Sequence, residues 1–340
     1  MRILERYGND ELARVWVAQM RDDPRSVVEF VEALQPPIPR EEKWVLIVSS
    51  MFGCPVGCAM CDAGGEYAGP LTREELLAQI DMLVSSRYPD RKVRSSKFKV
   101  QFARMGEPSL NPAVLEALRL LPSIYDAPGL LVSLSTVAPA RAGRFFDELL
   151  GIKNEHYQAG RFQLQFSIHT TDPEKRREII PIRTWTFEQM AAFGERFCCP
   201  VRGDRKVTLN FAPMAGCSID PAVIRDSFDP ERFLIKLTPL NPTLRSFDGG
   251  LRSVIDPYSP GTGQALIDGF AREGFEVILS IGEVEENRIG SNCGQYIQRA
   301  LHGKELPLGA YTTERYRDER HRITGRSNPH DRPYEGRASK

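Results

Sequence analysis

The sequence predicts an α/β protein: a partial (β/α)6 barrel with a short N-terminal helical segment and a polar C-terminal tail. From residue 44 onward, short runs of β-branched and aromatic residues alternate with segments whose apolar residues recur at helical spacing. Glycine-containing and polar motifs follow the short runs directly, where parallel strands would end. Six or so such units are fewer than the eight of a closed barrel, so an open one is expected.

Composition sets limits on the partners and on the cellular compartment. The chain has 340 residues, 45 Lys and Arg and 45 Asp and Glu, so its formal net charge is zero and no global field attracts nucleic acid. No apolar run is long enough to span a bilayer, and residues 1–6 lack the apolar core of a secretion signal. Seven cysteines, three of them clustered, favour a reducing compartment over a disulfide framework. We expect a cytoplasmic protein.

The first 43 residues are predicted to form the short helical segment. Residues 10–18 and 26–34 both carry apolar side chains at helical spacing, and Pro36, Pro37 and Pro39 then end the segment. This stretch is too short to bury a core alone. We expect it to pack as a helical cap on the main domain, residues 44–310.

Seven strands are expected in the main domain, with helices between them. Thr72 and Glu75 form a capping box, Asn111-Pro112 and Asp220-Pro221 are helix starts, and a late helix covers about 263–272. Alternating strands and helices imply parallel pairing, so the strand ends should open into one mouth. The expected strands cover residues 44–48, 98–102, 130–135, 162–168, 207–211, 233–237 and 277–280.

Residues 311–340 differ in character from the rest of the chain. They hold eight Lys and Arg against five Asp and Glu, include Pro329 and Pro333, and have almost no aliphatic residues. Such a composition predicts a flexible, Arg-rich tail. Contact with RNA phosphates and a simply solvated terminus are both compatible with it.

Three cysteines occupy the loop after the first strand of the main domain. Cys54, Cys58 and Cys61 follow a CxxxCxxC pattern. Three thiolates would hold three irons of a cubane [4Fe–4S] cluster and leave the fourth iron open for a small-molecule ligand. A zinc site with a distant fourth ligand is the stronger alternative, and buried structural cysteines are the weaker one.

This cysteine loop resembles that of the radical S-adenosylmethionine (SAM) superfamily, in which the open iron binds SAM. The resemblance implies a [4Fe–4S] cluster, SAM as second cofactor, and cleavage of SAM to a 5′-deoxyadenosyl radical. It narrows to the RlmN/Cfr-like branch of rRNA and tRNA adenine methyltransferases, because six further segments match in the family's order across about residues 44–300. These segments are Val48 to Cys54, Arg104 to Asn111, Leu134-Ser135-Thr136, Phe166 to Ile182, Leu240-Asn241-Pro242 and Asn292-Cys293-Gly294-Gln295.

The resemblance also implies roles for individual residues. Cys293 would be the methyl carrier: it takes a methyl group from one SAM, and a radical from a second SAM activates that group for addition to an adenine carbon. The implied partners are rRNA or tRNA and an electron donor of the flavodoxin or ferredoxin type. The implied SAM-binding residues are Gly106, Glu107, Ser135, Ser167, His169 and Asn241.

Two departures from the family pattern bear on the substrate. Ile47 stands where the family has its second catalytic cysteine, and only about 43 residues precede the barrel, where the family has a longer accessory domain. Cys217 would replace the missing thiol only if its loop reaches the site. Arg176, Arg177 and Arg183 are either contacts for a phosphate-bearing substrate or the polar side of a helix.

Three functions therefore stay open at this stage. The leading one is methyl transfer to an RNA adenine through Cys293. The second is a radical SAM enzyme that no longer methylates RNA and acts on another substrate, since Ile47 cannot replace a catalytic thiol. The third is an iron–sulfur, SAM-binding protein without turnover.

Overall fold

A single ten-stranded sheet organises the computed structural model, which describes residues 1–259, 261–282, 286, 289–291 and 296. The strand order is β1-β2-β3-β4-β7-β8-β9-β10-β11-β12, with β1 and β12 at the two ends, so the sheet is open. Every pair from β4 to β12 is parallel and follows chain order. The seven parallel strands are β4 (Lys43–Val48), β7 (Lys97–Phe102), β8 (Leu130–Thr136), β9 (Phe162–Ser167), β10 (Val207–Phe211), β11 (Phe233–Leu237) and β12 (Val277–Leu279).

This arrangement confirms the predicted α/β partial barrel, and all seven predicted strands are present. The predicted helix starts are also close to those observed. Thr72 accepts the backbone N–H of Glu75 in a full capping box, and Asp220 caps the helix that begins at Pro221. Asn111 accepts the N–H of Ala113, and the helix begins at Ala113, one residue later than expected. The predicted tail, residues 311–340, lies outside the described residues.

The N-terminal segment is not helical, contrary to the prediction. It forms β1 (Arg2–Gly8), β2 (Ala13–Gln19) and β3 (Val27–Ala33), an antiparallel extension that pairs with β4. Both faces of β2 and β3 are buried, so their apolar runs are nearly continuous, and such runs match helical spacing by coincidence. Their valines are the better indicator, because β-branched side chains fit a strand.

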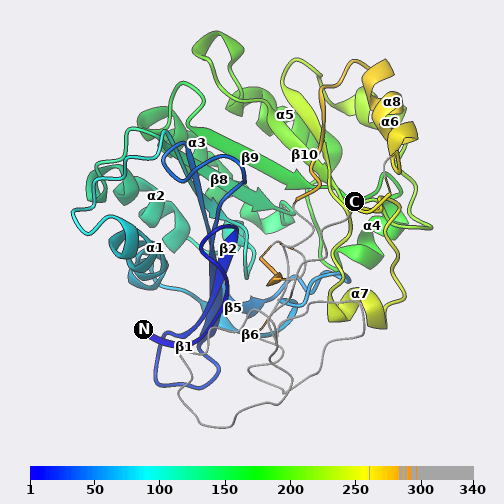
Figure 1. Cartoon of the computed structure of the whole chain (residues 1–340). Coiled ribbons are helices and arrows are strands. Elements are labelled where there is room, and N and C mark those ends of the chain that lie inside the picture. Colours follow the sequence, from blue (N-terminus) through cyan, green and yellow to red (C-terminus); the bar gives the residue numbers. More distant parts are fainter. Residues whose placement is uncertain (260, 283–285, 287–288, 292–295, 297–340) are drawn as a thin grey trace, which may run out of the picture.

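Helices cover one face of the sheet, and Figure 1 shows α1, α2 and α3 stacked along it. Aromatic side chains mark this face. Trp44 on β4 packs against Tyr88 at the end of α1, Phe166 on β9 packs against Phe146 of α3, and Gly194 of α5 lies against the ring of Phe233. The helices are α1 (Arg73–Arg87), α2 (Ala113–Ile124), α3 (Gly143–His156), α4 (Pro173–Ile179), α5 (Phe187–Phe197), α6 (Pro221–Ser227), α7 (Leu244–Asp248) and α8 (Gln264–Arg272). No described helix has the length and apolar character needed to cross a bilayer.

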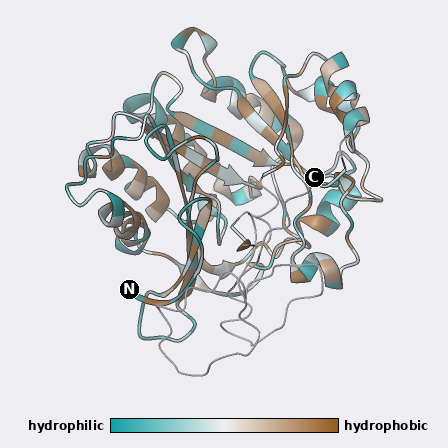
Figure 2. Ribbon diagram, in the orientation of Figure 1, coloured by the Kyte–Doolittle hydropathy of each residue, from teal (hydrophilic) through white to brown (hydrophobic). Residues whose placement is uncertain are grey.

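The opposite, inner face of the sheet is polar. Along β7 and β9 the side chains alternate between a buried apolar residue and a half-buried polar one, and Figure 2 shows hydrophilic residues interrupting the hydrophobic ones along the central strands. A purely structural barrel core would be filled with branched apolar side chains instead. The inner face carries Lys99, Gln101, Gln163, Gln165, Ser167, Asn210 and Lys236.

A buried ion pair connects the N-terminal strands to the parallel strands. Arg104, just after β7, donates from Nη2 to Glu29 of β3 at 2.6 Å, and the two side chains are 1% and 0% exposed. The same guanidinium donates to the backbone carbonyls of Gly290 and Ser291, at 2.9 Å each. One arginine therefore joins β3, the end of β7 and the chain near residue 290.

We expect Glu29→Gln to lower the free energy of unfolding by about 3 kcal/mol, because it leaves the Arg104 charge buried without its counter-ion. Chemical denaturation of the purified chain measures the change. Glu11→Gln, an exposed carboxylate in the same part of the chain, is the matched control and should stay within about 0.5 kcal/mol of the parent. Equal stability of the two variants would show that the pair does not support the fold.

Candidate functional site

The three clustered cysteines lie on a short hairpin formed by β5 (Met51–Cys54) and β6 (Gly65–Pro70), which the sequence did not predict. Glycines shape this hairpin. Gly53 has a φ of +68°, and a Cβ there would lie 2.7 Å from the carbonyl oxygen of Glu66. Gly57, between the first two cysteines, has a φ of +72°. Both positions need a residue without a Cβ, so the loop conformation depends on them.

The three thiols are neighbours in a buried environment. Burial raises the pKa of Cys54 and of Cys61 to about 11. The thiols are also close enough to act on one another: Cys54 and Cys61 raise the pKa of Cys58, and Cys54 raises that of Cys61. Within the described part of the chain, no three His, Cys, Asp or Glu side chains converge on one point as the ligands of a single ion do. In a cubane each thiolate binds its own iron, so three spaced thiols fit a cluster without converging. Iron cations would also offset the cost of ionising these thiols.

Hydrogen bonds fasten the cysteine loop to elements that follow two other strands. Ala59 donates its backbone N–H to Ile179 at the end of α4, at 2.8 Å. Asp62 accepts the backbone N–H groups of Leu244 and Arg245 at the start of α7, at 3.0 and 2.9 Å. Residues far apart in the sequence are thereby held around the three thiols.

Glu107, for which the resemblance implies SAM binding, lies beside the cysteines. Its carboxylate is close enough to raise the pKa values of Cys54 and Cys58. It accepts hydrogen bonds from Ser109, from the Thr136 hydroxyl at 2.6 Å and from the backbone N–H of Val137 at 2.9 Å. Complete burial raises the pKa of Glu107, and these donors partly offset that effect.

Gly106 allows this carboxylate to approach the hairpin. Its φ is +95°, and a Cβ would lie 2.6 Å from the Cβ of Met51 and 2.7 Å from the hydroxyl of Ser50. Any larger residue would push the Glu107 loop away from the cysteine loop. The close approach of the two loops therefore requires a glycine at position 106.

The other predicted SAM-binding residues lie at the ends of further strands. Ser135, near the end of β8, has a buried hydroxyl that makes no hydrogen bond within the described part of the chain, as a group that waits for a polar ligand would. Ser167 is the last residue of β9 and is half-buried. Asn241 is half-buried and follows β11 on the segment that leads to α7.

His169 is held in an uncommon backbone conformation after β9. Its φ is +67°, in the left-handed region that non-glycine residues rarely adopt. Its Nδ1 accepts the backbone N–H of Ala212 at 3.2 Å, and burial lowers its pKa to about 4. The imidazole is therefore neutral at physiological pH, and one ring nitrogen is already committed to the backbone.

Arg176 belongs to the site although the sequence analysis left its role open. It lies on α4 and is 9% exposed, its charge acts on Cys58 and on His169, and burial lowers its own pKa to about 10. The signal in the sequence that could have identified Arg176 is the family-like segment from Phe166 to Ile182. The pattern of charges along the helix did not distinguish Arg176 from its solvent-exposed neighbour Arg177.

Two further residues clarify the departures noted in the sequence. Ile47 lies on the inner face of β4, half-buried, opposite Val31 and Gln101 in the neighbouring strands. Cys217 is half-buried after β10, and the charges that act on its thiol are those of Lys175, Glu178 and Asp172, not those of the clustered cysteines. The structure therefore gives no support to Cys217 as a replacement thiol.

Cys293 lies outside the described residues, but the chain just before it is described. Gly290 and Ser291 are held by Arg104, which is three residues before Glu107. Ile289 is buried, and Tyr296 stacks on Tyr7 of β1 with ring centroids 3.8 Å apart. The residues on both sides of 292–295 are thus anchored on the N-terminal strands and on the loop after β7.

Comparison with known proteins gives relatives that are named as RNA methyltransferases. The chain is 29% identical over 297 residues to a Thermus thermophilus protein named "Probable dual-specificity RNA methyltransferase RlmN", covering 80% of this chain and 74% of the relative. It is 29% identical over 245 residues to "Dual-specificity RNA methyltransferase RlmN" of Marinobacter nauticus, covering 67% and 60%. No family model matches the chain.

A solved structure has a similar fold. The crystal structure of a radical SAM methyltransferase from Sphaerobacter thermophilus superimposes with a TM-score of 0.61, covering 82% of this chain and 76% of that one at 17% identity. Radical SAM proteins use a [4Fe–4S] cluster together with SAM, and the clustered thiols described above suit such a cluster. The chain is thus similar in sequence to proteins named RlmN and similar in fold to a radical SAM methyltransferase.

Proposed function

We propose that this protein is a radical SAM methyltransferase that transfers a methyl group to an adenine of RNA, with Cys293 as the methyl carrier. The observation that carries the proposal is the group of residues around the three thiols. Glu107, Arg176 and Arg245 follow three different strands: the charges of Glu107 and Arg245 act on thiols of the cysteine loop, and the Cys58 thiol acts on Arg176. The relatives named as RNA methyltransferases support the choice of RNA as substrate.

The residues around the thiols suit the two cofactors of this class. Cys54, Cys58 and Cys61 would hold the cluster, which supplies the electron for the chemistry when it is bound. The carboxylate of Glu107 would accept a hydrogen bond from the ammonium group of SAM, since its Oε2 has one donor, Val137, among the described residues. The unpartnered hydroxyl of Ser135 is one strand away, on β8. Ser167, His169 and Asn241 would contribute from the ends of β9 and β11.

Arg104 supports the role proposed for Cys293. Arg104 holds Ser291, which precedes Cys293 by two residues in the sequence, and it is itself three residues before Glu107. Arg104 would then act as a positioning residue, not as a catalytic one.

A second candidate function is favoured by the inner face of the sheet. Lys99 donates to Gln163 at 3.1 Å, and burial together with the charge of Lys236 lowers the pKa of Lys99 to about 7. Neither lysine forms an ion pair with a described carboxylate. Together with Ile47 in place of a catalytic thiol, this polar lumen suits a radical SAM enzyme whose substrate is a small anionic molecule.

Cluster binding can be tested with single substitutions. We expect Cys58→Ala to lose most of its iron and its sulfur-to-iron charge-transfer absorption after anaerobic reconstitution, because one of three thiolate ligands is gone. The parent should bind about four irons per chain. Cys199→Ser, at a half-buried cysteine of another segment, is the control and should keep the iron of the parent. Stoichiometric zinc with no iron in the parent would contradict the proposal.

The carrier role is tested by mass spectrometry. After incubation of the reconstituted protein with SAM, we expect a methyl group on the peptide that contains Cys293, and none in Cys293→Ser. Cys217→Ser is the matched control and should be methylated like the parent.

The RNA substrate is tested separately. RNA from cells that lack the protein should miss a methyladenosine that the parent cells contain. If Cys293 is methylated but the cellular RNA is unchanged, the result would favour the second candidate function, an enzyme with a small anionic substrate. An unmethylated Cys293 would contradict methyl transfer itself.

A further inference from the structure

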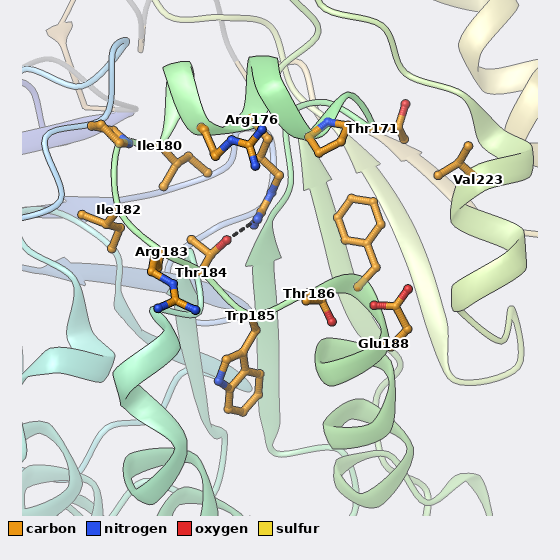
Figure 3. A pocket seen from close by; sticks show the side chains of 14 residues that line it. Thr171, Arg176, Ile180, Ile182, Arg183, Thr184, Trp185, Thr186, Glu188 and Val223 are labelled. Atoms are coloured by element: carbon orange, nitrogen blue, oxygen red, sulfur yellow. Dashed lines mark hydrogen bonds between the residues drawn. The ribbon is translucent and has the colours of Figure 1, made fainter.

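A pocket of about 860 Å³ lies between α4 and α5, beside the cysteine loop and separate from the strand ends that carry Glu107 and Ser135. Figure 3 shows it: Arg176 descends from α4, and Ile182, Arg183 and Thr184 line it from the segment that leads to α5. Its volume is within the range of pockets that bind small organic ligands. None of the SAM-binding residues predicted from the sequence lines it.

One wall of the pocket carries a buried cation, Arg176. It donates to the hydroxyl of Thr184, while its Nε and Nη2 atoms have no hydrogen-bond partner among the described residues. No carboxylate in the described part of the chain pairs with it. A buried, incompletely bonded guanidinium is costly, and two oxygens of one phosphate or carboxylate recover this cost through two parallel hydrogen bonds.

A second cation lies on the same wall. Arg183 is exposed, and no ion pair with a described residue involves it. In total, three arginines and one glutamate line the pocket. The pocket therefore favours a ligand with negative charge, and the guanidinium geometry favours phosphate.

Much of the remaining lining is apolar and suits a flat ring. Ile180, Ile182 and Phe187 line the pocket, and the Phe187 ring centroid lies 5.8 Å from the Arg176 guanidinium. An aromatic face next to an arginine is the usual platform for a nucleobase. A free phosphate would need the arginines but not this apolar wall. Phosphate and ring together describe a nucleotide.

The pocket lies next to the cysteine loop. Ile179, which ends α4 directly before the pocket-lining Ile180, accepts the backbone N–H of Ala59 in the cysteine loop at 2.8 Å. The Cys58 thiol is close enough to act on Arg176. A nucleotide in the pocket would thus be adjacent to the centre and not inside it.

We propose that the α4–α5 pocket binds a nucleotide that neighbours the reacting adenosine in the RNA strand. Its phosphate would contact Arg176 and Arg183, and its base would lie on the wall formed by Ile180, Ile182 and Phe187. This inference rests on the proposed function. A free nucleoside monophosphate has the same chemistry, so the experiment must separate the two sources.

The test measures binding of a short adenine-containing RNA, of adenosine monophosphate and of inorganic phosphate to the reconstituted full chain. We expect the parent to bind the RNA more tightly than the other two ligands. Arg183→Gln should weaken RNA binding about tenfold, and the slope of log affinity against log salt concentration should become shallower by about one. Arg176→Lys should also weaken RNA binding, because lysine cannot form the two parallel bonds. Arg202→Gln is the matched control, an exposed arginine at the opposite end of the barrel, and should bind like the parent.

SAM binding and iron content are measured in the same variants. Unchanged values for Arg183→Gln support the proposal and show that the site is intact. If Arg176→Lys loses SAM binding and keeps RNA binding, Arg176 serves SAM and the proposal is wrong. Tighter binding of free adenosine monophosphate than of RNA also overturns it. If all variants bind RNA equally, the role of the pocket is refuted and the proposed function is not. If the parent binds no RNA, both the role of the pocket and the proposed function are refuted.

Discussion

The buried ion pair between Arg104 and Glu29 is the interaction on which the arrangement of the site depends. It lies where three parts of the chain meet: the N-terminal strands, the loop after β7, and the chain at residues 290–291. Ser49 strengthens the junction by donating to the carbonyl of Glu29 and accepting the N–H of Met105 at 3.2 Å. Since Met105 directly precedes Gly106 and Glu107, this network also sets the position of the candidate SAM-binding loop.

Around this junction, contacts from outside add to the glycines in stabilising the cysteine loop. Ile179 accepts the N–H of Ala59, Asp62 caps α7, and Thr243 donates to the carbonyl of Met60 at 2.7 Å. The first contact comes from the segment after β9, and the other two come from the segment after β11. A loop held in this way keeps three thiols close without a metal, which reduces the ordering cost of binding a cluster.

The charged residues around the thiols differ in sign and therefore have opposite effects on the ionisation of the thiols. Glu107 opposes ionisation of Cys54 and Cys58, Arg245 favours ionisation of Cys61, and the Cys58 thiol raises the pKa of Arg176. A site that binds both an iron–sulfur cluster and the ammonium and carboxylate groups of SAM needs both signs within a short distance. The incompletely bonded Arg176 is the exception, since no described carboxylate neutralises it, and this is what connects the centre to the α4–α5 pocket.

The sequence by itself determined the seven parallel strands, the motifs at their ends and the cysteine spacing, because these depend on local patterns such as period-two alternation and helix caps like Thr72. It did not distinguish β2 and β3 from helices, since strands buried on both faces lose the alternation that identifies them. Only the tertiary structure decided which charges meet. The contact of Arg104 with Glu29, the burial of Arg176 beside Cys58 and the pairing of Lys99 with Gln163 join residues between 64 and 118 positions apart, and no local pattern specifies such contacts.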